Sequence, residues 1–288
     1  MTAPADADGP AGTVLRELRD DGVLVLTLNR PGRHNAWDLD MEERYFELLD
    51  EATTNPEVRV IVVTGTGETF CPGMDISRLK RATTDPTYVK PIRRPQTYAL
   101  GVPKPLVAAV DGACAGIGFV QALMCDLRFT TARSKWTTSF VRRALNVEDA
   151  VSWLLPRLVG TSRAADLILS ARVVRGDEAA RIGLVNEVVE PEELLPAALA
   201  WASDVARSCA PWSLAKAKEQ LLRDLHGGLE EARLRANIAL DEARDRADYR
   251  EGVASFTERR SPRFSGLDPA YGRIAVPGAT PRDAQIVQ

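Results

Sequence analysis

The chain has 288 residues, of which 45% are hydrophobic and 27% are charged, and its formal net charge at pH 7 is -3. These values are those of a globular protein with a substantial core, so they exclude a chain that is disordered throughout. The weak net charge argues against a function based mainly on binding nucleic acid or an anionic membrane surface.

Segment 1–12 is rich in small and acidic residues and is expected to be a flexible leader. It has neither the basic region nor the apolar run of a secretory signal, and no later stretch approaches the ~20 apolar residues that span a membrane. The four cysteines form no Cys-x-x-Cys pair, which indicates free thiols in a reducing compartment. We therefore expect a cytoplasmic protein without a membrane partner.

The first predicted elements are a hairpin and a helix. Alternating apolar runs at 14–18 and 23–28 flank Asp20-Asp21-Gly22, which is a good turn signal. A helix is expected to begin after Asp38, whose side chain suits the N-cap position, and to end before Pro56. The apolar run 58–63 then predicts a buried strand.

The alternation of strand and helix continues through a strand at 106–110, a helix near 119–124 and a short strand at 127–130. Strands that are apolar almost throughout indicate an α/β fold, in which helices cover both faces of the sheet. The segment 76–104 has several prolines and weak periodicity, so it is interpreted as a partly helical lid or loop.

From about residue 152 the pattern becomes mostly helical, with helices expected at 162–169, 192–208, 213–225 and 229–246. The predicted organisation is a leader at 1–12, a core at 13–200, a C-terminal helical region at 201–264 and a tail at 265–288. The tail is assigned because 266–288 is rich in glycine and proline and lacks periodicity.

Two loops rich in small residues follow apolar strands, and they carry the strongest functional signal. The first loop is 70–76 and the second is 111–118, and each has a glycine at the mouth of a predicted helix. Glycine allows backbone N–H groups to approach a ligand closely. Two such loops side by side would supply two N–H donors for an oxyanion during acyl chemistry, which points to an enzyme.

Seven short segments occur in a characteristic order along the chain: 28–31, 70–76, 104–112, 124–126, 154–160, 180–186 and 251–256. In these segments the chain resembles the crotonase superfamily, the enoyl-CoA hydratase/isomerase family. The similarity extends from about residue 13 to 264.

This resemblance implies a crotonase-like spiral of ββα units and a C-terminal helical region that builds trimers, often paired into hexamers. It implies an acyl-CoA thioester as ligand, with coenzyme A as part of the substrate, no other cofactor and no metal. The backbone N–H groups of Met74 and Ile117 would form the oxyanion hole. The residues that match substrate-binding positions are Gly73, Asp75, Ile76 and Gly116, together with Phe256 and Arg259, which would reach the CoA of a neighbouring subunit.

The two glutamates that hydratases of this family use are replaced here by Val120 and Phe140, neither of which transfers a proton. Glu148 falls where the family's 3-enoyl to 2-enoyl isomerases place a single catalytic acid. One carboxylate suffices for that reaction if an oxyanion hole holds the enolate. Asp149 is the alternative base, and a structural acid at the start of a helix is the alternative role for Glu148.

The expected function is therefore the shift of a 3-enoyl-CoA double bond to 2-enoyl-CoA through a thioester enolate. The alternatives are an enoyl-CoA hydratase, another crotonase-type hydrolase or lyase, and an acyl-CoA-binding protein without catalysis. The sequence does not fix the length of the acyl chain or the metabolic pathway, although the resemblance suggests fatty acid metabolism.

Overall fold

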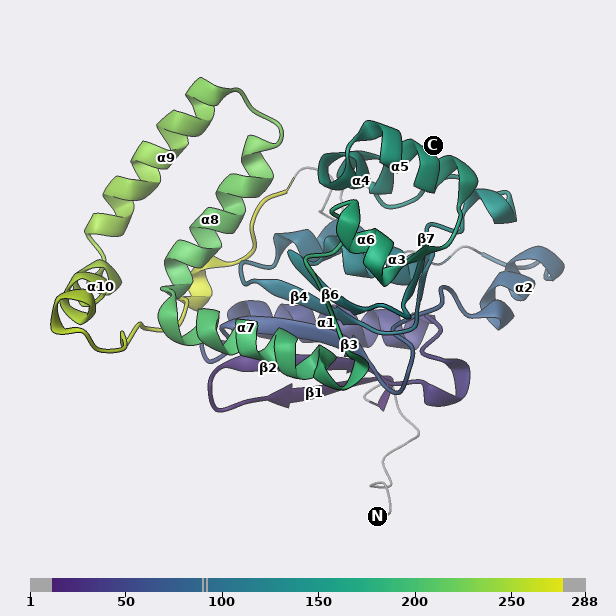
Figure 1. The fold of residues 1–288 in the computed structure, drawn as a ribbon, viewed down its shortest axis with the longest axis horizontal. Coiled ribbons are helices and arrows are strands. Elements are labelled where there is room, and N and C mark those ends of the chain that lie inside the picture. The colour runs from purple at the N-terminus through teal and green to yellow at the C-terminus, as the bar shows by residue number, and fades with distance from the viewer. Residues whose placement is uncertain (1–11, 90, 92, 277–288) are drawn as a thin grey trace, which may run out of the picture.

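The computed structural model describes residues 12–89, 91 and 93–276 (Figure 1). Segment 1–11 of the predicted leader and segment 277–288 of the predicted tail lie outside the described residues. The chain begins with the predicted hairpin: β1 (Val14–Leu18) pairs antiparallel with β2 (Val23–Leu28). Its turn contains Gly22 at φ +84°, a conformation that costs glycine little.

The main sheet has six strands in the order β1-β2-β3-β4-β6-β9. From β2 onward all its neighbours are parallel. The further strands of this sheet are β3 (Val60–Gly65), β4 (Leu106–Val110), β6 (Leu127–Thr131) and β9 (Glu187–Val189). A second sheet contains β5 (Ala113–Ala115), β7 (Lys135–Thr137) and β8 (Val174–Arg175).

Helices cover both faces of the main sheet, as predicted. In β3, Val60 and Val62 pack in the cluster that contains α7 (Leu194–Ser208). Ile61 and Val63 point the other way, into the cluster that contains α1 (Leu39–Thr54). Figure 1 shows α7 across one face and α1 behind the other. The strands are therefore buried on both sides, which explains their continuous apolar sequence.

The predicted N-cap of the first helix is confirmed, because the Asp38 side chain accepts a hydrogen bond from the Met41 N–H at 2.9 Å. The expected partly helical segment 76–104 contains α2 (Ile76–Thr84) and the short 3-10 helix η3 (Gln96–Gly101). The remaining elements before α7 are η2 (Pro31–Arg33), α3 (Ile117–Met124), η4 (Val141–Arg143), α4 (Val151–Val159), α5 (Thr161–Ser170), α6 (Gly176–Arg181) and η5 (Pro191–Glu193).

Three helices then extend away from the core: α8 (Pro211–Asp224), α9 (Leu229–Arg244) and α10 (Ala247–Glu258) (Figure 1). The predicted boundary between the core and the helical region, at 200/201, falls inside α7. Because α7 packs on the sheet along its length, the structural break follows this helix.

The described part of the predicted tail packs against the core and does not hang free. Leu267 and Ile274 are buried, the 3-10 helix η6 spans Pro269–Tyr271, and the Ile274 N–H donates to the Gly101 carbonyl at 2.8 Å. These apolar residues are isolated in the sequence and form no periodic pattern, so sequence periodicity does not reveal them. No helix within the described ranges is long and apolar enough to cross a membrane.

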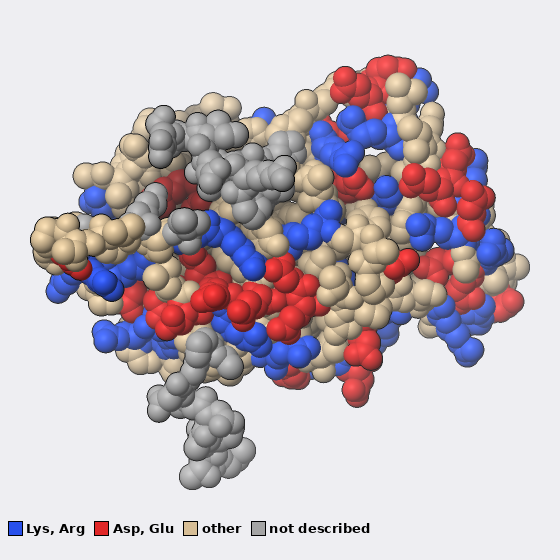
Figure 2. Space-filling view, turned by 180° about the vertical axis from the view of Figure 1, so that it is seen from behind, with Lys and Arg blue, Asp and Glu red and all other residues tan. Residues whose placement is uncertain are grey.

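Acidic and basic side chains lie beside one another on the face shown in Figure 2. On α1 and its neighbours, Arg44 pairs with Glu47 and Glu51, and Arg94 pairs with Asp50. Such exposed pairs contribute at most about 1 kcal/mol each. They balance charge locally more than they stabilise the fold.

Candidate active site

The two glycine-containing loops predicted from the sequence lie side by side. Cys71 and Cys114 form a parallel β-bridge, in which the Cys71 N–H donates to the Ala113 carbonyl at 2.9 Å and the Cys71 carbonyl accepts from the Ala115 N–H at 3.0 Å. A Cβ added to Gly116 would lie 3.9 Å from the Gly73 Cα. The two glycines that precede the expected donors are thus neighbours.

Both glycines have backbone conformations that other residues rarely adopt. Gly73 has φ +119° and Gly116 has φ +51° with ψ -119°. A Cβ on Gly73 would also come within 3.3 Å of the Ala115 carbonyl oxygen. The close approach of the two loops therefore depends on glycine at these positions.

The backbone N–H groups of Met74 and Ile117 have no acceptor within the part of the chain that the structure describes. The Trp37 backbone forms hydrogen bonds with the groups on either side of the Met74 N–H. Its N–H donates to the Gly73 carbonyl, and its carbonyl accepts from the Asp75 N–H. Ile117 is the first residue of α3, where an N–H has no partner within the helix. Two unpaired N–H groups from adjacent loops are what binding an anionic oxygen requires.

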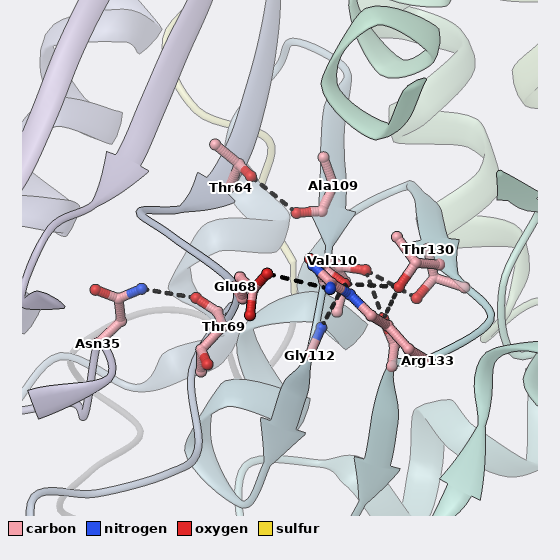
Figure 3. Close-up of polar contacts among 12 residues, drawn as sticks. Asn35, Thr64, Glu68, Thr69, Ala109, Val110, Gly112, Thr130 and Arg133 are labelled. Atoms are coloured by element: carbon pink, nitrogen blue, oxygen red, sulfur yellow. Dashed lines mark hydrogen bonds and ion pairs between the residues drawn. The ribbon is translucent and has the colours of Figure 1, made fainter. Parts of the chain in front are cut away.

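Polar side chains hold the two loops in place (Figure 3). The Asn35 amide donates to the carbonyls of Thr66 and Thr69, at 3.0 and 2.7 Å. Arg133 pairs with Glu68 and with Asp111, one from each loop connection. Because these contacts join residues far apart in the sequence, they fix the loops relative to each other.

Asp75 follows the first expected donor and is buried. Burial alone would raise the pKa of its carboxyl, but hydrogen bonds from Ser77 and Arg30 outweigh that effect and hold the pKa below its usual range. Asp75 caps α2 through the Ser77 N–H and pairs with Arg30 at 3.0 Å. It therefore stays ionised and orders the loop.

A cavity of about 540 Å³ lies beside this first loop. It is bordered by the start of α1, by α2 and by the residues after α2. Arg78 and Arg81 line it, and one buried guanidinium nitrogen of Arg78, Nη1, has no partner among the described residues. Ile76, the last residue of this loop and the first of α2, is exposed.

Val120 and Phe140, which replace the two expected glutamates, are buried and apolar. The first carboxylates after Phe140 in the sequence are Glu148 and Asp149, just before α4. Glu148 is exposed and Asp149 is half-buried. Asp149 and Ala150 both have left-handed backbones, with φ of +51° and +61°, so this segment is strained.

The surroundings of Asp149 favour its protonated form. Burial and the negative charges of Glu148 and Glu42 raise the pKa of Asp149 to about 6, although Arg93 and the backbone of Gln96 partly oppose this. A carboxyl group with a pKa this close to neutrality can both take and return a proton at physiological pH.

Asp149 interacts electrostatically with a buried polar network that the sequence did not predict. Glu42 accepts hydrogen bonds from the Trp37 indole at 3.0 Å, from the Gln96 amide at 3.1 Å, and from Arg93. The one available sequence signal was that Glu42 falls on the apolar face of the predicted helix, beside Met41. A buried acid without a partner nearby in the sequence implies a partner from elsewhere.

The remaining expected residues lie apart from this cluster. Phe256 and Arg259 are at the exposed end of α10, and 87% of Phe256 is exposed. The four cysteines are free, as predicted. Burial raises the pKa of the Cys71 thiol to about 12, so it is unreactive at neutral pH.

Known proteins are similar to this chain in sequence and in structure. A family model described as enoyl-CoA hydratase/isomerase matches residues 19–267. The (E)-benzylidenesuccinyl-CoA hydratase of Thauera aromatica is 33% identical over 85% of this chain and 96% of its own. The 1,2-epoxyphenylacetyl-CoA isomerase of Escherichia coli is 31% identical over 86% and 96%. The crystal structure of an enoyl-CoA hydratase from Bacillus anthracis superimposes with a TM-score of 0.83 at 27% identity, over 88% of this chain and 99% of that one.

Proposed function

The chain belongs to the enoyl-CoA hydratase/isomerase family, and we propose that it converts a 3-enoyl-CoA into a 2-enoyl-CoA through a thioester enolate. The observation that supports this choice is the set of carboxylates. The positions of the two hydratase glutamates hold buried Val120 and Phe140, while Glu148 and Asp149 stand beside each other before α4. The names of the similar curated proteins mostly say hydratase and one says isomerase, so the choice of isomerisation rests on the carboxylates and not on these names.

In the proposed mechanism, one carboxylate removes a proton from C2 of the acyl group. The electron pair moves into the conjugated system and places negative charge on the thioester oxygen, which accepts hydrogen bonds from the N–H groups of Met74 and Ile117. The same carboxyl group then returns the proton at C4. The reaction moves one proton and no net electrons, so it needs no cofactor beyond the CoA of the substrate.

Glu148 is the proposed proton carrier because of its position in the sequence, and Asp149 is the alternative. Both act on the same guanidinium, since Arg93 interacts electrostatically with each of them. The loop from Gly73 to Ile76, Gly116 and the adjacent cavity are proposed to bind the acyl-CoA. Arg78 offers that cavity a cation for a phosphate group.

We expect the protein to convert 3-enoyl-CoA to 2-enoyl-CoA faster than it hydrates 2-enoyl-CoA. Mass spectrometry of products from both substrates measures this directly, because hydration adds the mass of water and isomerisation does not. Efficient formation of 3-hydroxyacyl-CoA without an isomerised product would show that the enzyme is a hydratase. Exchange of the C2 proton in heavy water distinguishes either enzyme from a protein that only binds acyl-CoA.

We further propose that the C-terminal helices assemble the protein into trimers or hexamers. Within the described part of the chain α9 buries none of its own residues, and Leu229, Ile238 and Phe256 are 89%, 62% and 87% exposed. Exposed apolar side chains in such numbers are typical of a surface that packs against another subunit.

The Arg259 guanidinium is proposed to bind a CoA phosphate of the neighbouring subunit. Arg260 is already paired with Glu251 and Glu258, whereas Arg259 has no ion pair among the described residues. We expect Arg259→Ala to weaken CoA binding while Arg233→Ala, an exposed arginine of α9 paired with Glu230, does not. Calorimetry and light scattering test both points, and a monomer that binds CoA normally would contradict them.

A further inference from the structure

We propose that Glu42 and Arg93 are positioning residues of the active site: Glu42 holds Arg93 and Gln96 in place, and these hold and balance the Glu148–Asp149 carboxylate pair. The inference rests on the proposed function, because that proposal makes Glu148 the proton carrier and Asp149 the alternative. Neither residue is expected to touch the reacting atoms of the substrate.

Glu42 is a buried residue of α1 with several hydrogen-bond partners. It is 4% exposed, and its carboxylate accepts hydrogen bonds from three different side chains, those of Trp37, Arg93 and Gln96. Hydrogen bonds from this many donors offset the cost of burying the carboxylate. Its position is therefore well determined.

The hydrogen-bond partners of Glu42 connect it to each part of the site that the reaction would need. Trp37 joins it to the first loop, since the Trp37 backbone pairs with the residues on both sides of Met74. Gln96 accepts a hydrogen bond from the Gln121 amide on α3, the helix that begins with Ile117. The Gln96 backbone also forms a hydrogen bond with Asp149. One buried network thus links both expected N–H donors to the carboxylate.

The charged residues of this network have opposing effects on the pKa of Asp149. Asp149 interacts with Glu148 on its own segment, with Glu42 on α1 and with Arg93 just before η3. Arg93 is the cation in this group and favours the ionised form of Asp149. Glu42 opposes it, because it adds a negative charge. Removing the Arg93 charge should therefore raise the pKa of Asp149, and removing the Glu42 charge should lower it.

The sharpest test measures the Asp149 carboxyl directly in the resting protein. The full chain is labelled with ¹³C at the aspartate carboxyl carbons, and the Asp149 signal is identified as the one lost in Asp149→Asn. In the wild type this signal should titrate near pH 6. In Arg93→Met the midpoint should rise by about one pH unit, and in Glu42→Gln it should fall by a similar amount.

Two further variants control for structural damage. Arg93→Lys keeps the positive charge but loses the two-pronged contact with Glu42, so it should bring the midpoint back toward the wild-type value. Arg94→Met removes an adjacent, exposed arginine that pairs with Asp50 and should leave the midpoint unchanged. A merely structural role for Arg93 would lower thermal stability without moving the midpoint of the folded protein.

The two proposals fail in distinguishable ways. If the midpoints move as described but the wild type does not isomerise 3-enoyl-CoA, the positioning role stands and the assigned reaction is wrong. If isomerisation is observed and the midpoints of Arg93→Met and Glu42→Gln equal that of the folded wild type, the positioning role is wrong. Midpoints that shift in the same direction in both variants would also overturn it, because the charges would not act as described.

Discussion

Glu148→Gln is expected to lower isomerase turnover by about 10²–10⁴-fold, the usual effect of removing a general base. Glutamine keeps the length and the hydrogen-bonding capacity of the side chain but does not hold the migrating proton. The dissociation constant for CoA should change little, because binding is assigned to the first loop and its cavity. Exchange of the C2 proton in heavy water should be lost together with turnover.

Asp149→Asn is the matched control for this experiment. Asparagine still accepts the hydrogen bond from the Gln96 backbone and tolerates the left-handed φ of +51° at this position. We expect most of the turnover to remain, with its pH dependence altered by the lost charge. If Asp149→Asn is inactive and Glu148→Gln is active, Asp149 and not Glu148 is the proton carrier. If both variants are active, the proposed mechanism is wrong.

Local chemistry explains which parts of this structure the sequence predicts well. The hairpin turn at Gly22 and the N-cap at Asp38 each depend on residues a few positions apart, and both are found where expected. The glycines of the two loops are likewise required by their own backbone conformations. Strands β5, β7 and β8 have only two or three residues, so they are too short to show a periodic pattern in the sequence.

The parts that the sequence did not predict depend on contacts between distant segments. Glu42 and Arg93 are 51 positions apart, and their pairing follows from the packing of α1 against the chain before η3. Ile274, in the expected tail, is buried because its N–H and side chain fit against residues near Gly101. Such contacts depend on how distant segments pack in the whole fold, so no local sequence motif predicts them.

The contact between α3 and the first loop offers a second test with a large expected effect. Gly118 lies on α3, and a Cβ at this position would be 2.2 Å from the Cys71 carbonyl oxygen and 2.8 Å from the Cys71 Cβ. A backbone atom cannot turn aside as a flexible side chain can, so the helix and the loop would have to separate. Gly118→Ala should therefore destabilise the protein by about 1–3 kcal/mol, the typical cost of overpacking.

Separating α3 from the first loop would also move the Ile117 N–H away from the Met74 N–H. Because a displacement of about 1 Å at a catalytic group can cost about 10²-fold in rate, turnover in Gly118→Ala should fall by that order even in the folded fraction. Gly32→Ala is the control, since a Cβ on Gly32 meets nothing within 4 Å. Thermal unfolding and single-turnover isomerisation measure the two effects separately. A Gly118→Ala variant with wild-type stability and wild-type turnover would show that the two donors do not depend on this contact.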